Sequence, residues 1–285
     1  MSHERGLQLQ RMELKYIVSE NVALGVRSFI RSFLEIDEFG TGHPDFSYPV
    51  HSLYLDSDDL ALYWQTINGN PDRLKLRLRF YEDAEEAPVY LEIKQRRNAA
   101  ILKQRAGVHR AAIPKILAGQ LADSSDLVSR DSRELDAVQR FSTLMINHRC
   151  KPKAHIAFLR EAWVHRRDNS IRVTMDRRIH CEPETAARFD TRMMAPESVF
   201  GREVVLELKF TDRFPAWFGE LVRVFSLRQN SAAKYADGVV LIGEERFNRH
   251  QVERQRFCRD DREGCRADFL QGTRLASRSS RKDSA

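Results

Sequence analysis

The stretch RLKLRLRFY at residues 73–81 alternates basic and apolar side chains from Arg73 to Phe80. Successive side chains of a β-strand point to opposite faces, so this alternation places four cations on one face and four apolar side chains on the other. Neighbours on one face lie about 7 Å apart, so the cations repel each other unless an anion lies among them. A single strand of this kind is equally well explained by a solvated basic face. The choice depends on whether the pattern recurs.

The composition is that of a globular protein that can bury a sizeable core. The chain has 285 residues, of which 42% are hydrophobic. It contains no run of about 18 apolar residues, the length that a transmembrane helix needs. The N-terminal MSHERGLQLQ lacks the apolar segment of a secretory signal. The four cysteines have no CxxC spacing and are typical of reduced thiols. We therefore expect a cytoplasmic protein without a transmembrane segment.

The formal net charge of +6 is concentrated near the C-terminus. Residues 246–285 contain eleven Lys and Arg against six Asp and Glu, so the preceding body is close to neutral. A near-neutral body is not typical of a surface that binds duplex nucleic acid. We expect residues 246–285 to be a disordered basic tail, and we expect no specific nucleic-acid partner.

The body, which we place at residues 8–245, reads as one domain of alternating strands and helices. Alternating side chains predict strands at 11–17, 50–56, 73–81, 88–96, 99–108, 153–166, 170–176 and 202–210. Helical spacing and cap signals predict helices at about 21–35, 57–68, 111–121, 132–147, 214–227 and 231–240. At least five of the strands carry charged side chains on one face. This pattern predicts an α+β fold, a closed antiparallel β-barrel with helices on its outside and charges in its lumen.

A lumen lined by Arg and Lys suits a chain of phosphates. The planar fork of Arg makes paired hydrogen bonds to phosphate, and Lys supplies a compact charge. The glutamates among these cations are either counter-ions or ligands of Mn²⁺ or Mg²⁺, which take one or two carboxylates plus phosphate oxygens. Glu207 is our first candidate for a metal ligand and Glu13 the second, with Glu92 and Glu203 below them.

Seven short motifs occur in an order that resembles the VTC domain, over roughly residues 8–243. They are RMELKY at 11–16, RLRFY at 77–81, LEIK at 91–94, KQR at 103–105, LRxxW with IRVTMD within 159–176, VLELKF at 205–210 and SAAKY at 231–235. That domain is the polyphosphate-polymerase module of the vacuolar transporter chaperone complex, in the CYTH-like (triphosphate tunnel) superfamily. Each motif alone is common, and the shared order carries the resemblance.

The resemblance implies a tunnel-shaped barrel that binds nucleoside triphosphate and a growing polyphosphate. The implied phosphate-binding side chains are Lys15, Arg77, Arg79, Lys94, Lys103, Arg160, Arg172 and Lys234. Of these, the catalytic candidates are Lys15, Arg77, Arg79, Arg160, Arg172 and Lys234, and the implied metal ligand is Glu207. Arg73 and Lys75 gain no support from the resemblance, and we place them at the tunnel mouth.

The implied activity is that of a phosphotransferase, which moves the γ-phosphate of ATP to the end of a polyphosphate chain. Two alternatives stay open. The same cations and metal also suit hydrolysis of tripolyphosphate or of a nucleoside triphosphate, and a non-catalytic module binding polyphosphate beside a partner needs no turnover at all. From this sequence we expect neither the inositol-phosphate sensor domain nor the membrane helices that accompany the domain in the fungal complex. We expect any attachment to the inner face of a membrane to require a membrane-protein partner.

Overall fold

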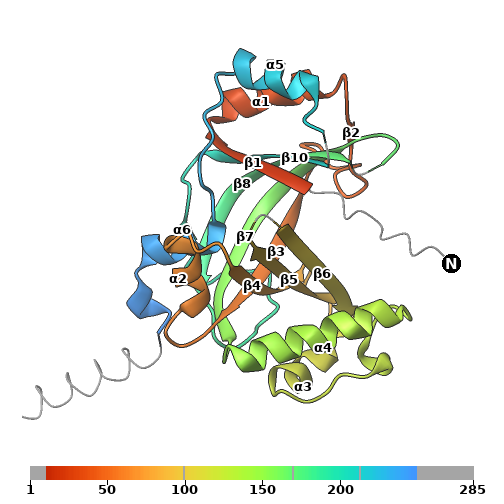
Figure 1. Ribbon diagram of the computed structural model, residues 1–285, viewed down its shortest axis with the longest axis vertical. Helices are drawn as coiled ribbons and strands as arrows, with labels where there is room; N and C mark the ends of the chain where they lie inside the picture. Colours follow the sequence, from red (N-terminus) through yellow and green to blue (C-terminus); the bar gives the residue numbers. More distant parts are fainter. Residues whose placement is uncertain (1–10, 99, 169, 212, 249–285) are drawn as a thin grey trace, which may run out of the picture.

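The computed structural model describes residues 11–248 apart from 99, 169 and 212, and in it the strands form one strongly curved antiparallel sheet (Figure 1). The strands are β1 (Arg11–Val18), β2 (Glu35–Ile36), β3 (Ser47–Asp56), β4 (Arg73–Phe80), β5 (Val89–Arg97), β6 (Ala100–Val108), β7 (Lys151–Val164), β8 (Ile171–Pro183), β9 (Glu197–Ser198) and β10 (Val204–Thr211). Their order is β1-β10-β8-β7-β3-β4-β5-β6, with β2 beside β7 and β9 beside β8. The predicted α+β class is confirmed.

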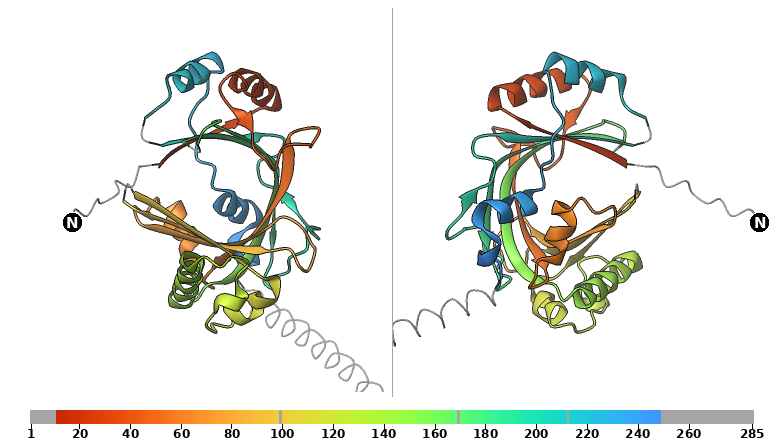
Figure 2. Two further views of the ribbon diagram at one scale, coloured as in Figure 1. Left: turned by 90° about the vertical axis from the view of Figure 1, so that its right-hand side faces the viewer. Right: turned by 60° about the vertical axis from the view of Figure 1, so that its left-hand side comes forward.

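Helices cover the outer face of the sheet and one end of the curve. They are α1 (Glu20–Ile30), α2 (Ala61–Ile67), α3 (Ile113–Leu117), α4 (Ser132–Asn147), α5 (Ala216–Val224) and α6 (Lys234–Ile242), with short 3₁₀ turns at Arg110–Ala112, Ser124–Asp126 and Glu244–Arg246. Figure 2 shows α1 and α5 against the outer face of one part of the curved sheet and α3 and α4 outside the opposite part, with α2 and α6 at one end. No helix in the described part of the chain is long and apolar enough to cross a lipid bilayer.

The alternation that predicted the strands also separates the core from the inner face. On β4, Leu74, Leu76 and Leu78 are buried in a core that includes residues of α4. On β10, Leu206 and Leu208 are buried in a second core with residues of α1 and α5. The charged side chains between these leucines therefore point to the concave side of the sheet.

The predicted closed barrel is wrong, because the sheet does not close. Within the described residues, no ladder joins the two end strands, β1 and β6. Each end is partly covered by the chain itself: Asn230 N donates to Lys15 O at 2.9 Å beside β1, and Val128 N donates to Gly107 O at 3.0 Å beside β6. Side chains bridge the opening instead, since Lys94 Nζ lies 3.0 Å from Glu13 Oε2.

Several boundaries differ from the predicted ones. Strand β8 continues to Pro183, beyond the predicted end at residue 176, because its second half still pairs with β7. Helix α3 is shorter than predicted, since Ala118 and Gly119 end it. The described chain stays packed as far as Phe247, which is buried in a third core beside α6. The predicted tail lies outside the described residues from position 249 on.

Asp56 at the end of β3 anchors α2 and α6 to the sheet. Its carboxylate is 0% exposed and accepts hydrogen bonds from Leu62 N and Tyr63 N at 2.8 Å and from Tyr235 Oη at 2.9 Å. We expect Asp56→Ala to lower the free energy of unfolding by about 3 kcal/mol or more, because these buried donors and the backbone N–H of Ser57 lose their acceptor. Urea denaturation measures this loss. The matched Asp59→Ala, at an exposed carboxylate of the same segment, should change it by less than about 1 kcal/mol.

Candidate functional site

The concave side of the sheet encloses a cavity of about 370 Å³ lined mainly by basic side chains. Of the described residues, eleven Lys and Arg line it against three Glu: Lys15, Lys75, Arg77, Arg79, Lys94, Lys103, Arg105, Arg160, Arg172, Lys209 and Lys234, with Glu13, Glu92 and Glu207. They come from β1, β4, β5, β6, β7, β8, β10 and α6. Like charges converging in a low-dielectric enclosure focus a strong positive potential on it.

The structure brings together all the side chains that the sequence assigned to phosphate or metal binding except Glu203. All eight predicted basic residues line the cavity, as do Glu207 and Glu13. Lys75, set aside by the resemblance, lines it too, whereas Arg73 does not. Glu92 also faces the cavity. Glu203 precedes β10, is exposed, and is not among the lining residues.

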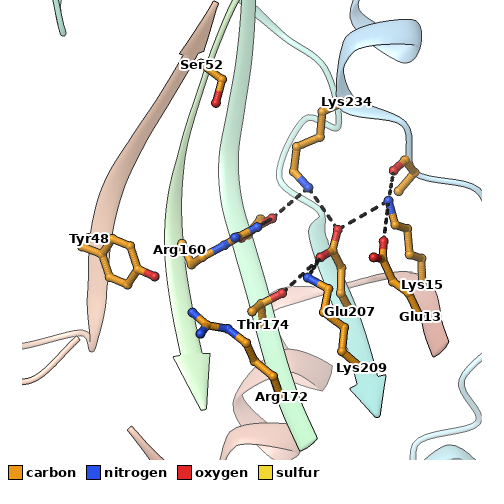
Figure 3. A network of polar contacts seen from close by, with 12 residues as sticks. Glu13, Lys15, Tyr48, Ser52, Arg160, Arg172, Thr174, Glu207, Lys209 and Lys234 are labelled. Carbon is orange, nitrogen blue, oxygen red and sulfur yellow. Dashed lines mark hydrogen bonds and ion pairs between the residues drawn. The ribbon is translucent and has the colours of Figure 1, made fainter. Parts of the chain in front are cut away.

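Glu207 lies at the centre of a polar network on β10 (Figure 3). Its carboxylate is 5% exposed, and its Oε1 lies 3.5 Å from both Lys15 Nζ and Lys234 Nζ. Its Oε2 accepts a hydrogen bond from Thr174 Oγ1 at 3.4 Å and pairs with Lys209. Burial favours the neutral acid, but the charges of the three lysines outweigh it and hold the pKa of Glu207 well below its usual value. Glu207 is therefore a carboxylate in this network.

The strand register explains why these side chains meet. Glu207 on β10 is paired with Lys15 on β1 and with Thr174 on β8. Opposite residues of an antiparallel pair have Cβ atoms about 5 Å apart, which is within reach of an ion pair. Helix α6 begins at Lys234, and Ala232 and Ala233 before it line the same cavity. The positive end of this helix dipole thus adds to the potential there.

A buried ion pair holds Arg160 in one orientation. Its Nε and Nη2 donate to the two oxygens of Asp176, both at 2.7 Å, across the ladder between β7 and β8. Lys234 Nζ lies 2.8 Å from the same carboxylate. Burial raises the pKa of Asp176, but Arg160 and Lys234 outweigh it and bring that pKa to about 2. Arg172 is held by a single hydrogen bond, which its Nη2 donates to Asp37 Oδ2 at 2.7 Å.

The arginines of β4 that face the cavity have too few carboxylates near them to neutralise their charge. Arg77 Nε donates to Glu92 Oε2 at 2.6 Å, and its Nη1 donates to Tyr54 Oη at 3.0 Å. Arg79 has only longer contacts, with Nε 3.3 Å from Ser52 Oγ and Nη1 3.7 Å from Glu92. Glu92 also serves two cations of β6, Lys103 at 3.6 Å and Arg105 at 3.8 Å. One carboxylate therefore faces four cations.

Three lysines of the cavity have lowered pKa values. Burial lowers the pKa values of Lys75, Lys103 and Lys209 to about 8, and neighbouring cations add to this effect. Each ammonium is thus less stable in the cavity than in water. A polyanion placed among them would supply the missing negative charge.

The donor set fits a divalent cation that shares the substrate's oxygens. Lys15 Nζ lies 3.3 Å from Glu13 Oε1 and 3.5 Å from Glu207 Oε1, so a metal ion bound by both carboxylates would take the place of this ammonium. Mg²⁺ and Mn²⁺ are bound by one or two carboxylates together with phosphate oxygens. No group of three or more His, Cys, Asp or Glu within the described residues is arranged to hold a metal unaided. A metal here would need the substrate to complete its ligands.

Sequence reasoning missed several lining residues, although a signal existed for most. Lys209 and Arg105 lie two positions after Glu207 and Lys103, on the same strand faces as these predicted residues. Asp176, which is not among the lining residues but holds Arg160, shares a face with Arg172 and lies opposite Arg160. The aromatic lining residues are Phe39, Tyr48, Tyr54, Tyr81 and Phe158, and the charge pattern gave no reason to select them.

Comparisons with known proteins point to one family. The family model of the VTC domain matches residues 10–242. Among solved structures, a protein of Bacillus halodurans assigned as an adenylate cyclase is 17% identical, with a TM-score of 0.43, and the match covers 79% of this chain and 95% of that one. No curated protein matches the sequence.

Proposed function

The chain belongs to the VTC domain family, and from this premise we propose that it is an ATP-dependent polyphosphate polymerase. The observation that carries the proposal is the cavity, where Lys and Arg from seven strands and one helix far outnumber the carboxylates. Such an excess is costly for a protein that binds nothing there, because buried like charges destabilise each other. A chain of phosphates is the ligand that balances it.

The reaction transfers the γ-phosphoryl group of ATP to a terminal oxygen of polyphosphate. The bond between the γ-phosphorus and the β–γ bridging oxygen breaks, a new P–O bond forms to the chain end, and ADP leaves. Such a transfer needs positioning and neutralisation of charge rather than covalent help from the protein. Arg77, Arg79, Arg160 and Arg172 would hold donor and acceptor phosphates in line.

Glu207 would be the ligand of Mn²⁺ or Mg²⁺, with Glu13 beside it. When bound, the metal supplies positive charge to the phosphate oxygens during transfer. Lys15 and Lys234, which already contact Glu207, would turn toward the phosphates. Lys94 and Lys103, on the more open side of the cavity, would hold the polyphosphate chain.

Incubation of the protein with ATP and Mn²⁺, followed by gel electrophoresis for polyphosphate and an assay for free phosphate, tests the proposal. Long chains with ADP support a polymerase. Free phosphate without chains indicates hydrolysis of the triphosphate by the same cavity. Binding of ATP and polyphosphate under several metals without turnover indicates a binding module.

The pKa values near 8 predict how binding depends on pH. Below pH 8 the ammonium groups of Lys75, Lys103 and Lys209 are charged, and a bound polyanion raises their pKa values further. Above pH 8 the free protein has lost these protons and must take them up on binding. We expect the affinity for tripolyphosphate to fall by about tenfold or more between pH 7.5 and pH 9.5, with proton uptake.

Calorimetric titration in two buffers of different ionisation enthalpy measures both the affinity and the proton uptake. Lys75→Arg, which stays charged throughout, is the matched variant and should take up about one proton fewer at pH 9. An affinity that does not change over this range would contradict the prediction.

A further inference from the structure

Phe39 is a large apolar side chain at an unexpected place. It is 57% exposed, yet it lines the cationic cavity, so it lies where the cavity opens to solvent. Its ring is parallel to that of Tyr81 within 2°, with centroids 6.3 Å apart, and it is tilted against Tyr48 at 5.6 Å. Three aromatic rings thus line one mouth of a cavity that is otherwise mostly basic.

The loop between β2 and β3 holds Phe39 in this exposed position. Asp37 in that loop is buried and accepts hydrogen bonds from Gly40 N at 3.1 Å, Tyr48 Oη at 3.2 Å and Arg172 Nη2 at 2.7 Å. Gly40 is needed for the turn, since a Cβ there would lie 2.8 Å from Phe46 O. The loop that presents Phe39 is therefore tied directly to a phosphate-binding candidate, Arg172.

The aromatic mouth also adjoins the other arginines. Tyr81 follows Arg79 by two positions, which in an extended chain corresponds to about 7 Å along the same face. Tyr48 on β3 is paired with Arg160 on β7. If these arginines hold an anionic group of a ligand, the adjoining part of that ligand would lie against the aromatic rings.

We propose that Phe39, Tyr48 and Tyr81 form the subsite for the base of the nucleoside triphosphate. This inference rests on the proposed function and adds the orientation of the donor. The base stacks at the aromatic mouth, and the triphosphate runs inward past Arg79, Arg160 and Arg172 toward Glu207. Ring faces do not read the hydrogen-bonding edge of a base, so the subsite accepts several bases and favours the larger purines.

Phe39→Ala separates the base from the phosphates in a binding experiment. The ligands are an ATP analogue with a β–γ imido bridge, which resists transfer, and tripolyphosphate, which has no base. Loss of a stacking face weakens base binding by about tenfold or more. We expect this loss for the analogue and an unchanged dissociation constant for tripolyphosphate. Phe39→Trp, with a larger ring, should bind the analogue at least as tightly as the wild type.

Phe33→Ala is the matched control, because Phe33 is 38% exposed and stacks on Trp217 outside the cavity. Both ligands should bind this variant as they bind the wild type. An equal loss of both ligands in Phe39→Ala would overturn the base subsite and make Phe39 a support of the cavity wall. An unchanged affinity for the analogue would overturn it as well. Failure of the wild type to bind either ligand would instead refute the proposed function.

Discussion

Glu207→Gln is expected to reduce metal-dependent turnover of ATP by at least about 100-fold while the protein stays folded. The metal contributes several kcal/mol to phosphoryl transfer, and an amide is a much weaker ligand for a hard cation than a carboxylate. Binding of tripolyphosphate should persist or become tighter, since Lys15, Lys209 and Lys234 lose a competing carboxylate. Turnover with ATP and Mn²⁺ and calorimetric titration with tripolyphosphate measure the two effects separately.

Glu203→Gln is the matched control, because Glu203 is exposed just before the same strand and is not among the lining residues. It should leave turnover and binding unchanged. If Glu207→Gln makes product at the wild-type rate, Glu207 does not hold the metal and the site assignment is wrong. A circular dichroism spectrum matching the wild type would exclude misfolding as the cause of any loss.

Arg79→Gln is expected to weaken tripolyphosphate binding by about 30-fold or more without lowering stability. Arg79 is 5% exposed, and its contacts with Ser52 and Glu92 are long. Burial lowers the pKa of Arg79, and the charge of Arg77 adds to this effect, so the guanidinium destabilises the ligand-free fold. Its hydrogen bonds to a bound phosphate would contribute about 2 kcal/mol.

Calorimetric titration measures the affinity of Arg79→Gln, and urea denaturation without ligand measures its free energy of unfolding. The unfolding free energy should equal or exceed that of the wild type. Arg202→Gln, at an exposed arginine before β10, should change neither quantity. A loss of about 3 kcal/mol in stability, or an affinity within twofold of the wild type, would show that Arg79 serves the fold rather than the ligand.

The inner face of the sheet could be predicted from the sequence because charged and apolar side chains alternate along its strands. Arg77 and Glu92 each lie between two apolar residues of their strand, so the common direction of their side chains follows from the local pattern. The order of motifs added Lys234, a single lysine at the start of a helix that periodicity could not distinguish from a surface residue. The charged strand faces thus follow from local sequence, whereas Lys234 and Lys103 follow only from the resemblance.

What could not be predicted depends on contacts between distant segments. The edges of β1 and β6 are partly covered by residues near 230 and 128. No local sequence pattern predicts that these segments, rather than another strand, lie along the two edges. The sharing of Glu92 by four cations depends on the register of three strands. Phe39 lies in a loop, where side chains do not alternate regularly between two faces. Its role could be inferred only from its position beside Tyr81 in the folded chain.

The opening between β1 and β6 has a mechanical consequence. In a closed barrel every strand is hydrogen-bonded to two neighbours. Any increase in its radius therefore breaks a row of backbone hydrogen bonds. Here the wall can part along one line, where the partly exposed Lys94 bridges to Glu13 by an ion pair that stabilises by about 1 kcal/mol or less. Separation of the two edges along this line would break this ion pair, but it would break no ladder between the described strands.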